Sequence, residues 1–172
     1  MELAEPSWYN TIKNRMCILM ANLIGAISTK GPANIDARIK DKVLLAANSP
    51  ISEKIAQCIG TSLWAVAEQL EIDGLLDNLT TVTCIFTKDG KTSIKLDPKE
   101  LGIYMRIIVY PMDKWNSFKR NPNEQLLIYM ILIEELAHHF WNIEDEVEVN
   151  YKVISIMKHI FPDIKMSDVY SL

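Results

Sequence analysis

Apolar positions in the first 74 residues recur at the period of an α-helix. Between residues 8 and 28 they return every three or four positions, and the helix-stopping pair Gly31-Pro32 closes the stretch. Residues 34–47 carry the same spacing. The pattern therefore predicts two helices, one over residues 8–28 and one over residues 34–47.

A third helix is predicted after Ser49, whose hydroxyl can cap it, with Pro50 in a first turn where proline has no hydrogen bond to lose. We expect it to end near Cys58 or to break at Gly60, with another helix over residues 63–70. Two helices joined at a glycine are also the pattern of a DNA-binding helix-turn-helix. The second of them contains no Lys or Arg to hold phosphates, which argues against nucleic-acid binding.

The hydrophobic period changes after residue 74 from that of helices to that of strands. Residues 80–87 are rich in β-branched and aromatic side chains, residues 88–91 form a hairpin-type turn, and residues 92–96 return as a partner strand. A further strand is predicted over residues 103–110. These segments predict a small, mostly antiparallel sheet of three strands.

Two more helices are predicted after the sheet. The sequence Asn-Pro-Asn-Glu at residues 121–124 offers a cap, a first-turn proline and the capping-box glutamate, so a long helix should span residues 122–141. The next should cover residues 144–160. The expected fold is therefore α+β in one domain, with a helical part at 1–74 and, at 75–172, the sheet followed by a long buried helix and its successor.

Composition limits the classes of function. A chain of 172 residues with 49% hydrophobic and 23% charged residues fits one globular domain. Its net charge of −4 gives no general attraction to nucleic acid or anionic lipid. Cys17, Cys58 and Cys84 are odd in number and far apart, which predicts reduced thiols. With no signal-peptide pattern at the start and no apolar run long enough to span a membrane, we expect a cytoplasmic protein.

One turn of the otherwise apolar long helix gathers two carboxylates and two imidazoles, Glu134, Glu135, His138 and His139. Residues four apart on a helix point in similar directions, so Glu134 and His138 share one stripe. A plain solvated face with Glu–His pairs is one interpretation. Acidic residues also open the next helix, where they suit its positive end.

The alternative is a metal site. Glu134, His138 and Glu146 form an oxygen and nitrogen ligand set for a divalent cation, and they leave Glu135 free beside them. A catalytic zinc keeps three protein ligands and one open position for a water molecule, which a neighbouring carboxylate can deprotonate. Such a set would suit hydrolysis.

The segment from residue 126 to 157, with ILIEELAHHFW followed by DEVEVNYKVISIM, resembles the active-site region of the ImmA/IrrE-type minimal gluzincin metallopeptidases. That family carries H-E-x-x-H on a helix and a glutamate ligand downstream, four residues before Asn or Asp. The resemblance implies a zincin-like fold in which Glu135 is the general base and His138 and Glu146 are metal ligands. It places Asn150 beside Glu146 on the same helix, and His139 beside the ligand histidine.

The chain departs from this family at one ligand, because Glu134 stands where the first histidine would be. Two carboxylates and one imidazole make a harder, more anionic site, which can bind zinc but would favour metals such as manganese or magnesium. The resemblance implies a metal-dependent peptidase that acts on a regulatory protein or peptide. The alternatives are an inactive, metal-free zincin-like protein that binds or regulates, and thirdly the helix-turn-helix protein.

Overall fold

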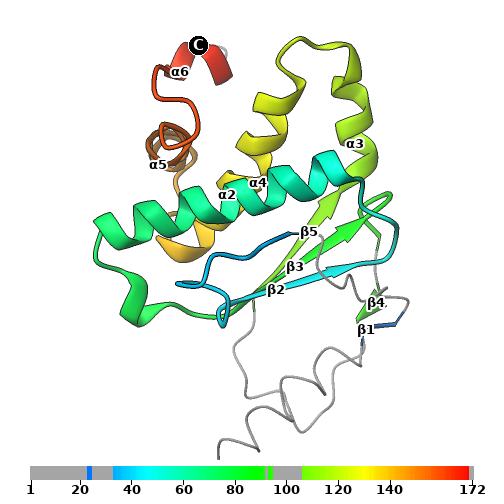
Figure 1. The fold of residues 1–172 in the computed structure, drawn as a ribbon, viewed down its shortest axis with the longest axis horizontal. Helices are drawn as coiled ribbons and strands as arrows, with labels where there is room; N and C mark the ends of the chain where they lie inside the picture. Colours follow the sequence, from blue (N-terminus) through cyan, green and yellow to red (C-terminus); the bar gives the residue numbers. More distant parts are fainter. Residues whose placement is uncertain (1–22, 25–32, 92, 95–105, 171–172) are drawn as a thin grey trace, which may run out of the picture.

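The computed structural model describes residues 23–24, 33–91, 93–94 and 106–170, and it has the mixed helix and strand content expected of the chain. The elements in chain order are β1 (Leu23–Ile24), β2 (Val43–Ala47), α2 (Glu53–Ile72), the 3-10 helix η1 (Leu76–Asn78), β3 (Val82–Thr87), β4 (Ser93–Ile94), β5 (Arg106–Pro111), α3 (Met112–Asn116), the 3-10 helix η3 (Ser117–Arg120), α4 (Glu124–Phe140), α5 (Glu146–Met157) and α6 (Met166–Val169). Figure 1 shows α2 lying over the three larger strands.

The three-stranded sheet is parallel throughout, so the predicted antiparallel arrangement is wrong. Its order is β2-β3-β5, and Cys84 of β3 is in register with Leu45 on one side and Ile108 on the other. Parallel strands need long crossover connections, and α2 supplies the one between β2 and β3. The turn after β3 has its expected glycine, Gly90, with a φ of 78°. The strand that follows, β4, pairs antiparallel with β1 instead of returning along β3.

The helix predicted over residues 34–47 is also wrong, because its second half is the strand β2. Residues 37–42 form turns that lead into Val43–Ala47. A short apolar run such as VLLAA fits a buried parallel strand as well as it fits a helix, and pairing with β3 decides between them. The helix predicted over residues 8–28 lies mostly outside the described residues, and its described part, Leu23–Ile24, is a strand.

Helix α2 runs without interruption through the predicted break at Gly60. Ser52 caps it through a hydrogen bond from the Ile55 amide to its hydroxyl, at 3.3 Å. A glycine inside a helix costs about 1 kcal/mol relative to alanine, a small amount beside the burial of one whole face of a 20-residue helix. The two-helix hairpin on which the DNA-binding interpretation depends is therefore not formed.

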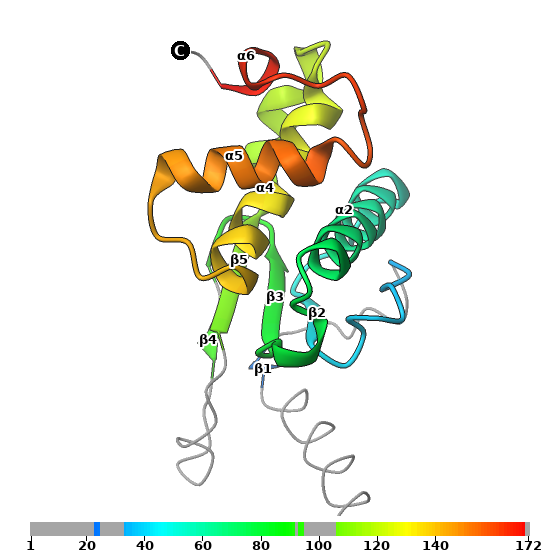
Figure 2. The ribbon, with the colours of Figure 1, turned by 90° about the vertical axis from the view of Figure 1, so that its left-hand side faces the viewer.

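Helices α2 and α4 cover one face of the sheet, and α5 packs against both of them (Figures 1 and 2). Sheet and helices meet in a shared core, whose central members are Ile59, Leu63, Cys84, Phe86, Tyr110, Leu132 and Leu136. The rings of Phe86 and Tyr110 stack at 5.1 Å, and the Tyr110 hydroxyl donates a hydrogen bond to the carbonyl of Leu132 at 3.1 Å. This contact fixes α4 against β5, as expected for a buried helix.

Asp73, directly after α2, ties the three main helices together. Its carboxylate accepts hydrogen bonds from Gln69 at 3.0 Å, from the indole of Trp141 at 2.7 Å and from Lys152 at 2.8 Å. Burial acts to raise the pKa of Asp73, but the hydrogen bonds from Lys152, Trp141 and Gln69 outweigh it and lower that pKa. The end of α2 is thereby bound to the α4–α5 connection, which carries the candidate site.

Cys58 and Cys84 are free and buried, as predicted, whereas Cys17 lies outside the described residues. Burial raises the pKa of the Cys84 thiol to about 12. Within the part of the chain that the structure describes, every helix is too short or too polar to cross a bilayer.

Candidate metal centre

The end of α4 and the start of α5 bring one imidazole and two carboxylates together. Glu134 and His138 are one turn apart on α4, and Glu146 is the first residue of α5. One ligand atom from each of these three residues lies within 4.8 Å of the other two. The cluster that the sequence predicts is thus assembled in space.

The short connection between α4 and α5 allows Glu146 to approach Glu134 and His138. Asn142 takes a left-handed conformation with a φ of 52°, which asparagine tolerates better than most residues. The chain then turns inward at the buried Ile143. Asp145 caps α5 by accepting a hydrogen bond from the Glu148 amide at 2.8 Å. Turn and cap together bring Glu146 back over the last turn of α4.

The imidazole of His138 is oriented by the same connection. Its Nδ1 donates a hydrogen bond to the carbonyl oxygen of Ile143, at 2.6 Å. Because Nδ1 carries the proton, the lone pair of the neutral ring is on Nε2, which lies 3.9 Å from Oε2 of Glu146. Metal-bound histidines usually donate their other N–H to a carbonyl or carboxylate in this way.

The electrostatics of the cluster favour a cation. Burial raises the pKa of Glu134, and the negative charges of Glu135 and Glu146 raise it further, while His138 acts in the opposite direction. Two carboxylates this close repel each other, and a bound cation would relieve both the repulsion and part of the desolvation. Glu134 and His138 are half-buried, and the Glu146 side chain is 75% exposed. The cluster is therefore accessible from one side.

Tyr170 is a further residue near the cluster, and no sequence pattern indicates it. Its hydroxyl is buried and has no hydrogen-bond partner among the described residues. Burial raises the pKa of Tyr170, and the charges of Glu134 and Glu146 raise it further, so the phenol lies near both carboxylates. It directly follows the short helix α6, which contacts α4 and α5. No sequence spacing links a residue 24 positions after Glu146 to the cluster.

The other predicted residues lie in different surroundings. Glu135 is exposed on α4 and is not among the three clustered ligands, although its charge acts on Glu134. His139 is buried, and its Nε2 donates to the carbonyl of Thr80 at 3.2 Å, so it braces α4 against the segment before β3. Asn150 is half-buried on α5, one turn after Glu146.

The donor set fits a divalent cation. It provides two carboxylate oxygens and one imidazole nitrogen whose tautomer is already set. These are ligands for zinc and for harder ions such as manganese.

Comparisons of the chain with protein-family models, with curated proteins and with solved structures gave no match. The chemistry of the cluster is therefore the basis for any functional conclusion.

Proposed function

We propose that this protein is a cytoplasmic, metal-dependent peptidase-like hydrolase that acts on a regulatory protein or peptide. The observation that carries the proposal is the orientation of His138. Its Nδ1–H donates a hydrogen bond to the carbonyl of Ile143, and its Nε2 faces the carboxylates of Glu134 and Glu146. The resemblance of residues 126–157 to the ImmA/IrrE-type peptidases supports the same assignment.

Each residue of the site has a role in this proposal. Glu134, His138 and Glu146 hold a divalent cation, which when bound supplies Lewis-acid activation of water and of the scissile carbonyl. Glu135, exposed at the next position of α4, accepts the proton of the attacking water and passes it to the leaving amine. The unpartnered hydroxyl of Tyr170 donates a hydrogen bond to the substrate oxygen as it gains negative charge.

The ligand set also bears on which metal is used. Two carboxylates and one imidazole are harder and more anionic than two imidazoles and one carboxylate. We therefore propose that manganese competes effectively with zinc at this site. Activity reconstituted separately with each metal after chelation would rank them.

Metal content tests the cluster directly. Elemental analysis of protein purified without chelator should find about one divalent ion per chain. Glu146→Gln and His138→Ala should each lose it. Glu148→Gln is the matched control, because Glu148 is also exposed in the first turn of α5 but is not one of the clustered ligands. Wild-type protein that stays metal-free after incubation with zinc or manganese overturns the proposal.

A wild-type protein that binds no metal would favour the inactive, zincin-like alternative. In that case the three residues would be a polar patch on a binding or regulatory protein. Glu134, in place of a ligand histidine, would then be the reason that the site binds no metal. Restoring a histidine by Glu134→His would then create zinc binding that the wild type lacks. In the hydrolase proposal, the same substitution changes metal preference toward zinc without creating the site.

A further inference from the structure

A second site lies at the opposite end of the sheet from the metal cluster. The strands β2, β3 and β5 are parallel, so their carboxyl ends meet at one edge, at Ala47, Thr87 and Pro111. Open parallel sheets bind their ligands at this edge. The metal cluster lies toward the other edge, since Arg106, the first residue of β5, donates to the carbonyl of His138 at 3.4 Å.

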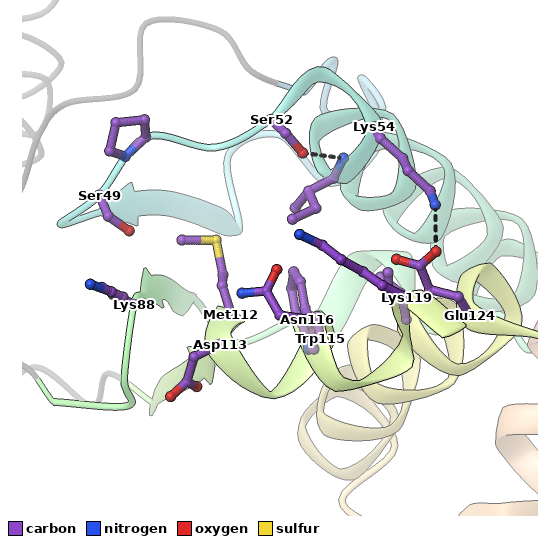
Figure 3. A pocket seen from close by; sticks show the side chains of 13 residues that line it. Ser49, Ser52, Lys54, Lys88, Met112, Asp113, Trp115, Asn116, Lys119 and Glu124 are labelled. Atoms are coloured by element: carbon purple, nitrogen blue, oxygen red, sulfur yellow. Dashed lines mark hydrogen bonds and ion pairs between the residues drawn. The ribbon is translucent and has the colours of Figure 1, made fainter. Parts of the chain in front are cut away.

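A cavity of about 390 Å³ is present at the carboxyl edge (Figure 3). Its walls are the connection from β2 to α2, the first turn of α2, the residue after β3, the helices α3 and η3, and the start of α4. This volume is in the range of pockets that hold small molecules. Glu124 at its wall begins α4, whereas His138 is near the end of that helix, about 20 Å away along the axis at a rise of about 1.5 Å per residue.

Three lysines from three separate elements line the cavity, namely Lys54 of α2, Lys88 after β3 and Lys119 of η3. Lys54 forms an ion pair with Glu124 at 2.9 Å. Neither Lys88 nor Lys119 forms an ion pair with any described residue. Two cations at one cavity therefore have no anionic partner within the described chain.

One acidic side chain at the cavity opposes this charge. Asp113 lines it, but Figure 3 shows its carboxylate pointing away from Lys119 and Asn116. Glu124 is already neutralised by Lys54. The positive charge of Lys88 and Lys119 thus remains available to a ligand.

Ser49 gives an independent indication of a polar ligand. Its hydroxyl oxygen is buried and has no hydrogen-bond partner among the described residues. Figure 3 shows this hydroxyl on the same side of the cavity as Lys88. Buried polar groups in native proteins are nearly always paired, so the Ser49 hydroxyl is available to donate a hydrogen bond to a group in the cavity. The first amides of α2, which have no partner within their helix, add positive potential at this edge.

We propose that the cavity binds a phosphate group. Lys88, which lies on the same side of the cavity as Ser49 in Figure 3, and the Ser49 hydroxyl bind the phosphate oxygens, while Lys119, on the other side of the cavity, adds positive potential. The apolar wall formed by Ile55, Met112 and Trp115 leaves room for the rest of a small phosphorylated molecule. Lysine is suited to this role because its ammonium acts as a point charge that accepts a range of phosphate orientations.

Calorimetric titration of the full-length protein with inorganic phosphate in the presence of EDTA tests the proposal, since the chelator prevents binding through a metal. Lys88→Ala should weaken phosphate binding about tenfold, the loss expected for one charge-assisted hydrogen bond, and Lys119→Ala should weaken it less, because it removes only positive potential from the far side of the cavity. Lys158→Ala, at an exposed position at the end of α5, is the matched control and should bind like the wild type. Glu146→Gln should also bind phosphate normally, which separates this site from the proposed metal centre.

A parallel titration with ribose 5-phosphate and with ribose identifies the source of the phosphate. Tighter binding of ribose 5-phosphate than of phosphate, with no binding of ribose, supports a phosphorylated small molecule. Equal affinity for the two phosphates supports free phosphate as the ligand. Absence of phosphate binding, or equal weakening in Lys88→Ala and Lys158→Ala, overturns the proposal.

Discussion

The imidazole of His138 is held by the backbone of Ile143, five residues further along the chain, through a hydrogen bond of 2.6 Å from Nδ1 to the carbonyl oxygen. The helix that supplies the histidine and the connection that orients it are thus parts of one local unit. The carboxylate of Glu146 lies at the far end of the same connection.

The left-handed turn at Asn142 should control both stability and metal binding. A β-branched residue is strained at a φ of 52°, so Asn142→Val should lower the free energy of unfolding by about 2 kcal/mol. It should also weaken metal binding, because Ile143 and Glu146 would shift. Asn142→Gly is the control and should cost less than about 0.5 kcal/mol, since glycine adopts this conformation readily. Urea unfolding with metal titration measures both effects, and equal losses in the two variants would contradict the argument.

Glu135 should matter for turnover and not for metal binding. It is exposed beside the cluster without belonging to it, so Glu135→Gln should keep the wild-type metal content. Hydrolysis of an unstructured protein substrate should fall by about 10²- to 10⁴-fold, as expected for loss of a general base. Glu144→Gln, an exposed residue before α5, should leave the rate unchanged. Loss of metal in Glu135→Gln would assign this carboxylate to the ligand set instead.

The hydroxyl of Tyr170 should stabilise a reacting substrate, and it should lower the stability of the protein when no substrate is bound. Its oxygen is buried without a partner among the described residues, so Tyr170→Phe should raise the free energy of unfolding of the metal-free protein by about 1 kcal/mol. The same variant should lower kcat with little change in KM, because the hydrogen bond forms as charge develops. Tyr151→Phe, at a side chain that is 67% exposed, is the control for both measurements. Unchanged stability and kcat would remove Tyr170 from the site.

The free energy of unfolding should fall in mildly acidic solution, because the buried imidazole of His139 resists protonation in the folded protein. Burial lowers the pKa of this imidazole below 6.5, the hydrogen bond to Thr80 opposes the change, and Arg106 adds to it. The unfolded chain therefore binds a proton at a higher pH than the folded protein does. The contribution of neutral His139 to the free energy of unfolding is complete above pH 6.5, and it is lost as the pH falls through the folded-state pKa of His139.

His139→Gln removes this titration and can keep a donor for the Thr80 carbonyl. Urea unfolding at a series of pH values should show a smaller loss of stability below pH 6.5 in the variant than in the wild type. Above that pH, the free energy of unfolding should change with pH at the same rate in the two proteins. Parallel curves throughout would mean that another group causes the loss.

The helices around the site could be predicted because their signals are local. A proline at residue 122 lies just before α4, and acidic residues open α5. The predicted capping box at Asn121 and Glu124 is wrong, because α4 begins at Glu124 after Asn123, whose side chain makes no cap hydrogen bond. The observed helices, Glu124–Phe140 and Glu146–Met157, fall inside the predicted ranges. Helix spacing and the residues that favour a helix start are properties of a few neighbouring positions, so no tertiary information is needed.

The sheet could not be predicted because its pairing is not local. The run VLLAA at Val43–Ala47 fits a helix or a buried strand, and β3 decides the outcome from almost 40 residues away. Likewise, a strand, a Gly90 turn and a second strand indicate a hairpin, but here the second strand pairs with Leu23–Ile24. Gly60 suggested a helix end, yet packing of α2 on the sheet outweighs the local cost of glycine.

Only the part of the candidate site that depends on helix spacing and on the residues that follow could be predicted from the sequence. The spacing of Glu134 and His138, followed by the acidic start of α5, was enough to predict the cluster that the structure assembles. The spacing alone did not show that His139 turns away to Thr80, since adjacent residues on a helix point about 100° apart and the packing around them differs. Tyr170 reaches the cluster through the packing of α6, which no periodic pattern encodes.

Parallel pairing also constrains how this protein is made. No strand of the β2-β3-β5 sheet can find its neighbour through a tight turn, so the central strand gains both partners only after Pro111 has left the ribosome. Until then the apolar strand β3 has at least one open edge, which can recruit a strand from another nascent chain. Products truncated before β5 should therefore aggregate during synthesis.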